Sequence, residues 1–191
     1  IVNGSEIKKN SDHFKEVFGN DQHVLVLVQA DDVFAPDVLN MIDRLGERLE
    51  QEVPFADKVT SLTTISIPIG DEEGFEVKSP FDDGIPTDAQ ELAEKKAFIM
   101  SRESIVNNLV SDNAKECWLS LKLNPFKNES EDVSAVGHAA EKVIMSDEFK
   151  SDRWTLMPIG SAYTTAEKED VLTKDFVSRI GLGFLVMLIC L

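Results

Sequence analysis

The sequence predicts an α+β fold in which four strands form one antiparallel sheet and two helices cover one of its faces. Three observations support this prediction: apolar runs of strand length, helices with an apolar stripe, and a strand, helix, strand order that occurs twice. The chain has 191 residues, of which 42% are hydrophobic, so it is long enough to bury a core. We therefore expect a globular domain.

The first strand–helix–strand unit is predicted between residues 24 and 67. Residues 24–28 (VLVLV) form a continuous apolar run, which is typical of a strand buried on both faces. Pro36 marks the first turn of a helix, since proline is well tolerated there. One face of this helix carries an apolar stripe of Val38, Ile42, Leu45 and Leu49. Residues 59–67 (VTSLTTISI) are rich in β-branched residues and predict the second strand.

An insertion of about residues 68–113 is predicted between the second and third strands. Its first part is acidic and rich in turn residues, with a short strand predicted at 75–78. Thr87 and Gln90 fit a capping box, which predicts a helix from there to about residue 100. We therefore expect a helical insertion, which this connection tolerates because it only crosses the edge of the sheet.

The second strand–helix–strand unit is predicted between residues 117 and 159. Residues 115–123 (KECWLSLKL) alternate between apolar and polar, so they predict a half-buried strand with Cys117 packed on the buried side. An amphipathic helix is predicted from about residue 130 to 149. Residues 154–159 predict the fourth strand, and its proline favours an edge position or a strand end. Two such split units give the βαββαβ order of a ferredoxin-like fold.

A last helix is predicted from residue 166, and it continues into the apolar run 180–191 (IGLGFLVMLICL). A core helix normally keeps a polar stripe, which this run lacks. We expect residues 1–165 to form an extracytoplasmic domain and residues 166–191 to lead into a truncated transmembrane segment. The residues expected where it enters the membrane are Arg179, Phe184 and Leu188. The alternative is a buried C-terminal helix of a soluble domain.

The charge of the chain restricts its partners. There are 35 acidic and 19 basic residues, which give a formal net charge of -16. Such a surface repels phosphate backbones, so we expect no nucleic-acid partner. It also repels anionic membrane surfaces, so electrostatic docking of the whole domain on a bilayer is not expected. The two cysteines, Cys117 and Cys190, are too few for a disulfide scaffold.

Residues suited to catalysis or metal binding are sparse. The three histidines do not lie at a metal-ligand spacing: His13, His23 and His138. No serine lies in a nucleophile elbow, and no glycine pattern resembles a phosphate loop. The acidic clusters at 31–32, 71–73 and 82–83 do not match a calcium loop. We therefore expect no enzyme active site, no metal and no cofactor.

Short motifs follow one another in a specific order over residues 14–191. They are FKEVFG at 14–19, VLVLV at 24–28, DDVF at 31–34, PDVL at 36–39, KVTSL at 58–62, VSDN at 110–113 and PIG at 158–160. In this order and spacing they resemble the first extracytoplasmic loop domain of permeases of the resistance–nodulation–division (RND) superfamily. Within it, they resemble the branch of hydrophobic-substrate exporters called the MMPL family.

The resemblance implies a function in transport. In such permeases the domain lies outside the cell membrane and forms part of the export route for lipids or other amphiphilic compounds. The implied partners are the rest of the same permease, including a second similar external domain. The resemblance leaves open whether the permease forms a homo-oligomer. Proton movement drives export through carboxylates that would lie outside this chain. The insertion at 68–113 is short, so we expect no hairpin for docking an outer-membrane channel.

Two alternatives to the exporter remain. The first is a membrane-anchored extracytoplasmic sensor or ligand-binding domain, which needs a closed pocket. The second is a soluble ferredoxin-like regulatory domain or enzyme, which leaves the apolar run 180–191 unexplained. The exporter hypothesis predicts that both chain ends leave the fold on the same side, because both return to the membrane.

Overall fold

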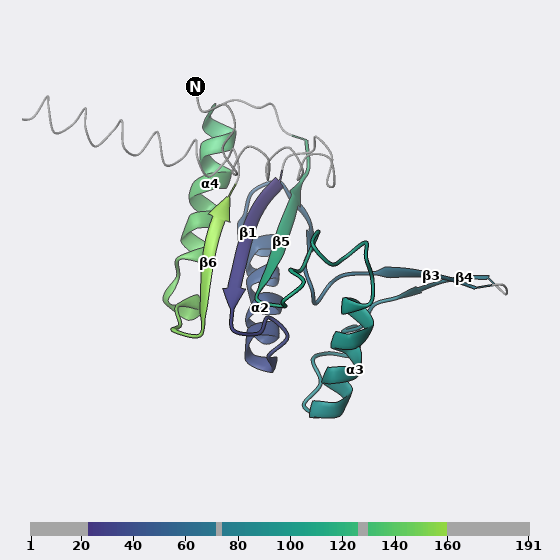
Figure 1. Cartoon of the computed structure of the whole chain (residues 1–191). Coiled ribbons are helices and arrows are strands. Elements are labelled where there is room, and N and C mark those ends of the chain that lie inside the picture. The colour runs from purple at the N-terminus through teal and green to yellow at the C-terminus, as the bar shows by residue number, and fades with distance from the viewer. Residues whose placement is uncertain (1–22, 72–73, 126–129, 160–191) are drawn as a thin grey trace, which may run out of the picture.

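The fold is α+β, and we describe it from a computed structural model that covers residues 23–71, 74–125 and 130–159 (Figure 1). The elements in chain order are β1 (His23–Ala30), α2 (Pro36–Glu52), β2 (Ala56–Thr60), β3 (Ile67–Asp71), β4 (Gly74–Lys78), α3 (Ala89–Met100), β5 (Glu116–Leu123), α4 (Ser130–Ile144), the 3₁₀ helix η1 (Asp147–Phe149) and β6 (Trp154–Ile159). The predicted α+β class is therefore confirmed.

Four strands form an antiparallel sheet in the order β2-β5-β1-β6. Val26, in the centre of β1, lies opposite Leu119 of β5 on one side and Pro158 of β6 on the other. Each neighbour is antiparallel, so β1 runs parallel to β2, and β5 runs parallel to β6. The predicted strand–helix–strand units are thus both present, and each inserts its first strand between the strands of the other. The edge position predicted for the fourth strand is also confirmed.

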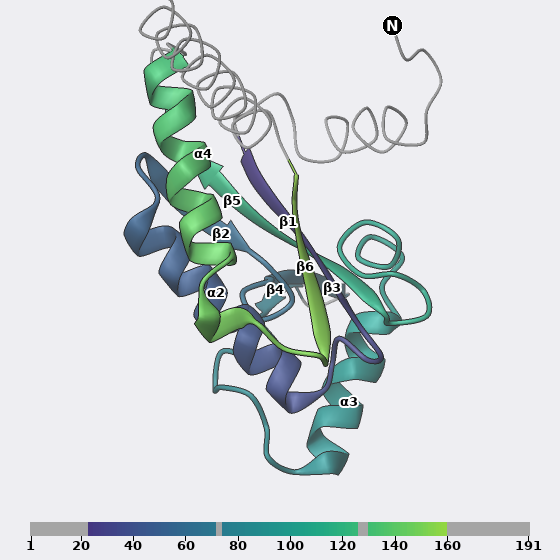
Figure 2. The same cartoon turned by 90° about the vertical axis from the view of Figure 1, so that its left-hand side faces the viewer.

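Helices α2 and α4 lie on the same face of the sheet (Figure 2). The predicted apolar stripe of α2 is fully buried and consists of Val38, Ile42, Leu45 and Leu49. It packs over the sheet, where Val26 and Leu119 have no exposed surface. Gly46 allows the close approach, since a Cβ atom there would lie 3.1 Å from Cγ1 of Val59 in β2. This layer between helices and sheet is the hydrophobic core.

The strand predicted at residues 59–67 is wrong in its extent. Strand β2 ends at Thr60, and a turn stabilised by hydroxyl groups follows. The backbone N–H of Ser61 donates to Oγ1 of Thr64 (2.9 Å), and this hydroxyl donates to the carbonyl of Val59 (3.1 Å). β-branched threonines favour strands, but their hydroxyls also offer the backbone local partners, and here the local bonds prevail.

The insertion is not mainly helical, because a hairpin precedes its helix. Strands β3 and β4 pair with each other and extend away from the four-stranded sheet (Figure 1). The short strand predicted at residues 75–78 is therefore confirmed as β4, whereas its partner β3 was not predicted. That the insertion holds no hairpin for docking an outer-membrane channel stays a prediction. Ile67 anchors the hairpin in the core, with 3% of its surface exposed, whereas Val77 further out is 55% exposed.

The helix of the insertion begins one residue later than the capping box predicts. Asp88 is the N-cap of α3, and its carboxylate accepts hydrogen bonds from the backbone N–H groups of Gln90 (3.0 Å) and Glu91 (2.9 Å). A carboxylate also interacts favourably with the positive end of the helix dipole, which explains why Asp88 and not Thr87 occupies this position. The helix predicted to end near residue 149 stops at Ile144, where η1 soon follows.

The predicted C-terminal helix lies outside the described residues, and so do Arg179, Phe184 and Leu188. Within residues 23–71, 74–125 and 130–159, no helix combines the length and the apolar character needed to cross a bilayer. The described part of the chain nevertheless begins and ends at one end of the sheet. Leu25, near the start of β1, lies directly opposite Ile159 at the end of β6.

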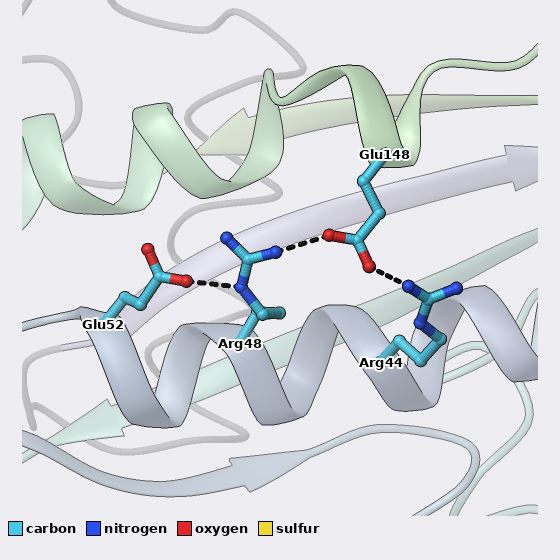
Figure 3. A network of polar contacts seen from close by, with 4 residues as sticks. All are labelled: Arg44, Arg48, Glu52 and Glu148. Atoms are coloured by element: carbon cyan, nitrogen blue, oxygen red, sulfur yellow. Dashed lines mark hydrogen bonds and ion pairs between the residues drawn. The ribbon is translucent and has the colours of Figure 1, made fainter.

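An ion-pair network joins the two strand–helix–strand units (Figure 3). Glu148 of η1 accepts hydrogen bonds from Arg44 and Arg48 of α2. Arg48 also pairs with Glu52 one helical turn further on. The hydrogen bond with Glu52 is the main reason why the pKa of Arg48 is raised, and the same bond lowers the pKa of the Glu52 carboxyl.

Acid is expected to weaken this network. The pKa of Glu52 is lower in the folded protein than its ordinary value of 4.5, so its stabilising contribution is complete above that value and is lost as the pH falls through the lower folded value. We expect Glu52→Gln to reduce the decline of the free energy of unfolding between neutral pH and the acid range. Urea unfolding at a series of pH values measures this. The control Glu47→Gln, on the same helix, should leave the decline unchanged, and an equal decline in all three proteins would contradict the prediction.

The close contact between α2 and β2 predicts coupling between Gly46 and Val59. Alanine favours a helix over glycine by about 1 kcal/mol, but the added Cβ presses on Val59. We expect Gly46→Ala to be more favourable in a Val59→Ala background than in the original protein, by about 1 kcal/mol. Urea unfolding of the four proteins gives this coupling energy. The same effect of Gly46→Ala in both backgrounds would show that the contact is relaxed.

Candidate functional site

The four-stranded sheet has an inner face toward α2 and α4 and an outer face on the opposite side. Directly opposed residues of an antiparallel pair share a face. Two rows of such residues cross β5, β1 and β6 on the outer face: Trp118, Leu27 and Met157, then Ser120, Leu25 and Ile159. Five of these six side chains are apolar. In the part of the chain that the structure describes, no helix lies over this face (Figures 1 and 2).

The outer face presents apolar side chains to its surroundings along β6, whereas Leu25 (7% exposed) and Ser120 (2% exposed) in the middle of this face are buried. Met157 is 38% exposed and Ile159 is 41% exposed, whereas Leu27 and Trp118 are half-buried. An antiparallel sheet with one solvated face normally alternates between apolar residues inside and polar residues outside. A contiguous apolar patch on the outside indicates an interaction surface. We therefore take these two rows as the candidate functional site.

A row of basic residues borders the apolar rows at the end of the sheet where β1 begins. It crosses β2, β5 and β1 and consists of Lys58, Lys122 and His23, which we call the basic row. Nζ of Lys122 lies 3.6 Å from a carboxylate oxygen of Asp57. Nδ1 of His23 lies 3.0 Å from the hydroxyl of Ser120. Along the strands, the outer face thus changes from basic side chains, at the end where β1 begins, to mainly apolar side chains.

The opposite end of the sheet carries two open, polar depressions. One of about 340 Å³ is lined by Gln29, Ala30, Asp31, Lys115, Glu116, Asp152, Arg153, Trp154 and Thr155. The other, of about 230 Å³, adjoins it. Several polar side chains here already have partners: Arg153 pairs with Asp37 (2.6 Å), and Gln29 donates to Glu116 (2.7 Å).

Cys117 is packed in the sheet interior, as its alternation pattern predicts. It is 1% exposed and lies opposite Val28 on the inner face. Burial raises the pKa of its thiol far above the ordinary value. Because the thiolate is the reactive form, Cys117 is unsuited to act as a nucleophile.

Among the described residues, the other candidate metal-binding or catalytic side chains do not come together. No group of three His, Cys, Asp or Glu side chains within the described ranges has a geometry suited to a metal ion. Asp32, from one acidic cluster, has a structural role: its carboxylate accepts from the backbone N–H of Phe34 (2.9 Å) and from Nζ of Lys96 (2.7 Å). It thereby ties α3 to the loop after β1. His138 is exposed on α4, and His13 lies outside the described residues.

The residues of the candidate site were not identified from the sequence. The run at 24–28 predicts a strand buried on both faces, and that interpretation hides the partial exposure of Leu27. In β6 the exposed positions Met157 and Ile159 are apolar, and so are the less exposed neighbours Leu156 and Pro158. The sequence of β6 therefore shows no alternation between apolar and polar residues there. The presence of apolar residues on both faces of β6 is the feature of the sequence that could have indicated this site.

No protein-family model matches the chain, and no curated protein matches it. The assignment of the candidate site therefore depends on the geometry of the described residues alone.

Replacing the exposed apolar side chains of the outer face should reduce dye binding without unfolding the protein. We expect the double variant Met157→Ser, Ile159→Ser to bind less of the neutral dye Nile red, while its free energy of unfolding changes by less than about 1 kcal/mol. Dye fluorescence and urea unfolding measure the two effects.

Two controls accompany this experiment. Met145→Ser, which changes an apolar residue 46% exposed elsewhere, should leave dye binding unchanged. Leu119→Ala on the inner face should lower the free energy of unfolding by about 2–5 kcal/mol. Equal dye binding by the outer-face variant and the original chain would show that these rows are not an accessible apolar surface.

Proposed function

We propose that the chain is an external domain of a proton-driven RND-type membrane exporter of the MMPL branch. In this proposal the outer face of the sheet borders the route that lipids or other amphiphilic compounds follow out of the membrane. The observation that carries the proposal is the pair of exposed apolar side chains on the outer face, Met157 and Ile159, over which no helix lies within the described residues. A domain that acts alone would normally have a polar face there.

The strand order supports a ferredoxin-like fold, which is the fold that the resemblance implies. The order β2-β5-β1-β6 follows from two interleaved strand–helix–strand units. The hairpin β3–β4 and α3 form the insertion between the second and third strands of the main sheet. External domains of such exporters would use this architecture as a rigid plate.

The positions of the strand ends also support the proposal. Leu25 lies opposite Ile159, so the chain enters β1 and leaves β6 at the same end of the sheet. A domain inserted between two membrane helices must have its ends on the same side. The proposed location is therefore the extracytoplasmic side of the cell membrane, with the basic row at the end of the sheet nearest the bilayer.

The outer face suits a transient apolar contact. Sheets that pack face to face lie about 10 Å apart, and a second external domain could therefore close over this face when no substrate is present. A substrate that separates the two faces would replace that contact with its own apolar surface, at about 25 cal/mol per Å². Since both states bury apolar area, the free-energy difference between them is small, as a transport cycle requires.

Export itself tests the proposal. In the complete protein expressed in cells, we expect Met157→Glu together with Ile159→Glu to reduce the export of a neutral fluorescent amphiphile, because two carboxylates on the route disfavour apolar passage. Accumulation of the amphiphile in energised cells measures the effect. Met145→Glu, a charge added outside the outer face, should leave export unchanged.

Labelling determines the location independently of transport. A cysteine introduced by Glu103→Cys at an exposed position of the insertion should react with a membrane-impermeant maleimide in intact cells. The experiment uses a Cys190→Ser background, and Cys117 is buried and should contribute little. Labelling only after lysis, or no export by the original protein, would contradict the proposal, and an external location without export would favour the sensor.

A further inference from the structure

Helix α3 is attached to the domain differently from α2. Among its twelve residues, all of which the structure describes, only Ile99 is fully buried, whereas α2 buries seven residues. Leu92, Phe98 and Met100 are half-buried. In Figures 1 and 2, α3 lies outside the two layers formed by the sheet and the other helices. Since packing supplies most of the stability of a helix in a protein, α3 needs further contacts to stay docked.

Lys96 supplies such a contact between α3 and the loop after β1. Its Nζ donates to a carboxylate oxygen of Asp32 (2.7 Å), and it lies 5.3 Å from the centre of the Phe34 ring. Phe34 is 1% exposed, so the ammonium group lies over a buried ring. Asp32 is itself fixed, because it accepts a hydrogen bond from the backbone N–H of Phe34 (2.9 Å). Lys96 thus combines an ion pair and a cation–π contact.

Lys95 makes a similar contact with the segment that precedes α3. Its Nζ donates to the carbonyl of Pro80 (2.6 Å) and lies 5.9 Å from the centre of the Phe81 ring. Phe81 is also buried. Glu91, one helical turn earlier, lies 3.4 Å from the same ammonium group. Lys95 therefore ties α3 to the connection from the hairpin, and Lys96 ties it to the main sheet.

We propose that α3 is a latch that opens and closes while the four-stranded sheet stays folded. In the closed state Lys96 lies on Asp32 and Phe34, as in this structure. In the open state residues 89–96 separate from the sheet, while Ile99 stays anchored in the core. Opening uncovers one face of the Phe34 ring and leaves the Asp32 carboxylate without its ammonium partner. This inference goes beyond the proposed function and does not depend on it.

The contacts that close the latch are weak enough to break before the core does. The side chains of Lys96 and Asp32 are 34% and 45% exposed, and ion pairs between exposed groups contribute little to stability. Strand β1, in contrast, pairs on both sides, and Val26 and Val28 have no exposed surface. Segments with few buried apolar contacts open at a lower free energy than the core.

The position of α3 affects the polar end of the sheet. Asp32 lines the depression of about 230 Å³, together with Asp31 and Asp152. In the closed state, the charge of Lys96 offsets that of Asp32. Opening leaves this depression more negative, next to a newly exposed aromatic ring. The latch therefore sets both the charge and the apolar exposure of this end.

Hydrogen exchange of the 191-residue chain, followed by mass spectrometry, tests the proposal. We expect the backbone amides of α3 to exchange at least roughly tenfold faster than those of β1 and β5. Raising the NaCl concentration from about 0.05 M to about 0.5 M screens the pair of Lys96 and Asp32. This change should speed the exchange of α3 by roughly threefold relative to β1.

Variants of the pair identify the contact. Lys96→Gln should speed the exchange of α3 by roughly fivefold and Asp32→Asn by roughly threefold, and both should reduce its dependence on salt. Asp32→Asn keeps a side-chain oxygen for the N–H of Phe34. The double variant should exchange no faster than Lys96→Gln, because both changes remove the same pair. Lys96→Arg keeps the cation and should retain slow exchange. The control Lys78→Gln, in the hairpin, should have no effect.

Three results would overturn the latch. Exchange in α3 as slow as in β1 would show that the helix opens only when the whole domain unfolds. Equal exchange of α3 in Lys96→Gln and in the original chain would show that apolar contacts alone hold the helix. Exchange that rises equally in β1 and α3 of the variants would assign the pair to the stability of the whole domain. Export in cells tests the proposed function and leaves the latch unaffected.

Discussion

The connection between β1 and β2, and the one between β5 and β6, determine how this domain uses its surfaces. Each helix connects two parallel strands that are separated by a strand of the other unit. Such crossovers are right-handed in nearly all proteins, and the two units run in opposite directions, so both helices must lie on the same face. That face gains the core of Val26, Leu45 and Leu119. The other face receives no helix from these units, and Met157 and Ile159 remain exposed there.

Both edges of the four-stranded sheet have features that disfavour pairing with a further strand. Pro158 lies opposite Val26 and has no backbone N–H. The β1–β6 ladder tolerates a proline only at a position where the N–H of another residue would point away from β1. The free edge of β6 therefore lacks a donor near its end. The opposite edge, β2, is five residues long and contains a bulge. Both features disfavour the addition of a further strand. Within the described residues, the edges of the sheet are therefore poor sites for pairing with a further strand, which leaves the outer face as the candidate contact surface.

The sequence predicts the inner half of this structure better than the outer half, for physical reasons. The stripe of α2 and the alternation around Cys117 predict their elements because burial selects apolar side chains at regular spacing. Competing local bonds defeat the same reasoning at residues 61–64, where hydroxyls end β2 early. The outer face depends on which residues lie opposite one another across three strands. Lys58 and Lys122 are far apart in the chain, and only the register brings them together.

The two ends of the outer face differ, and this difference gives the surface a direction. At the end where β1 begins, the basic row adjoins Leu25 and Ile159. At the other end, Gln29 and Glu116 pair with each other beside the polar depressions, so the apolar rows end at Trp118. In the proposed location the end where β1 begins lies nearest the bilayer, and the end with the polar depressions lies furthest from it.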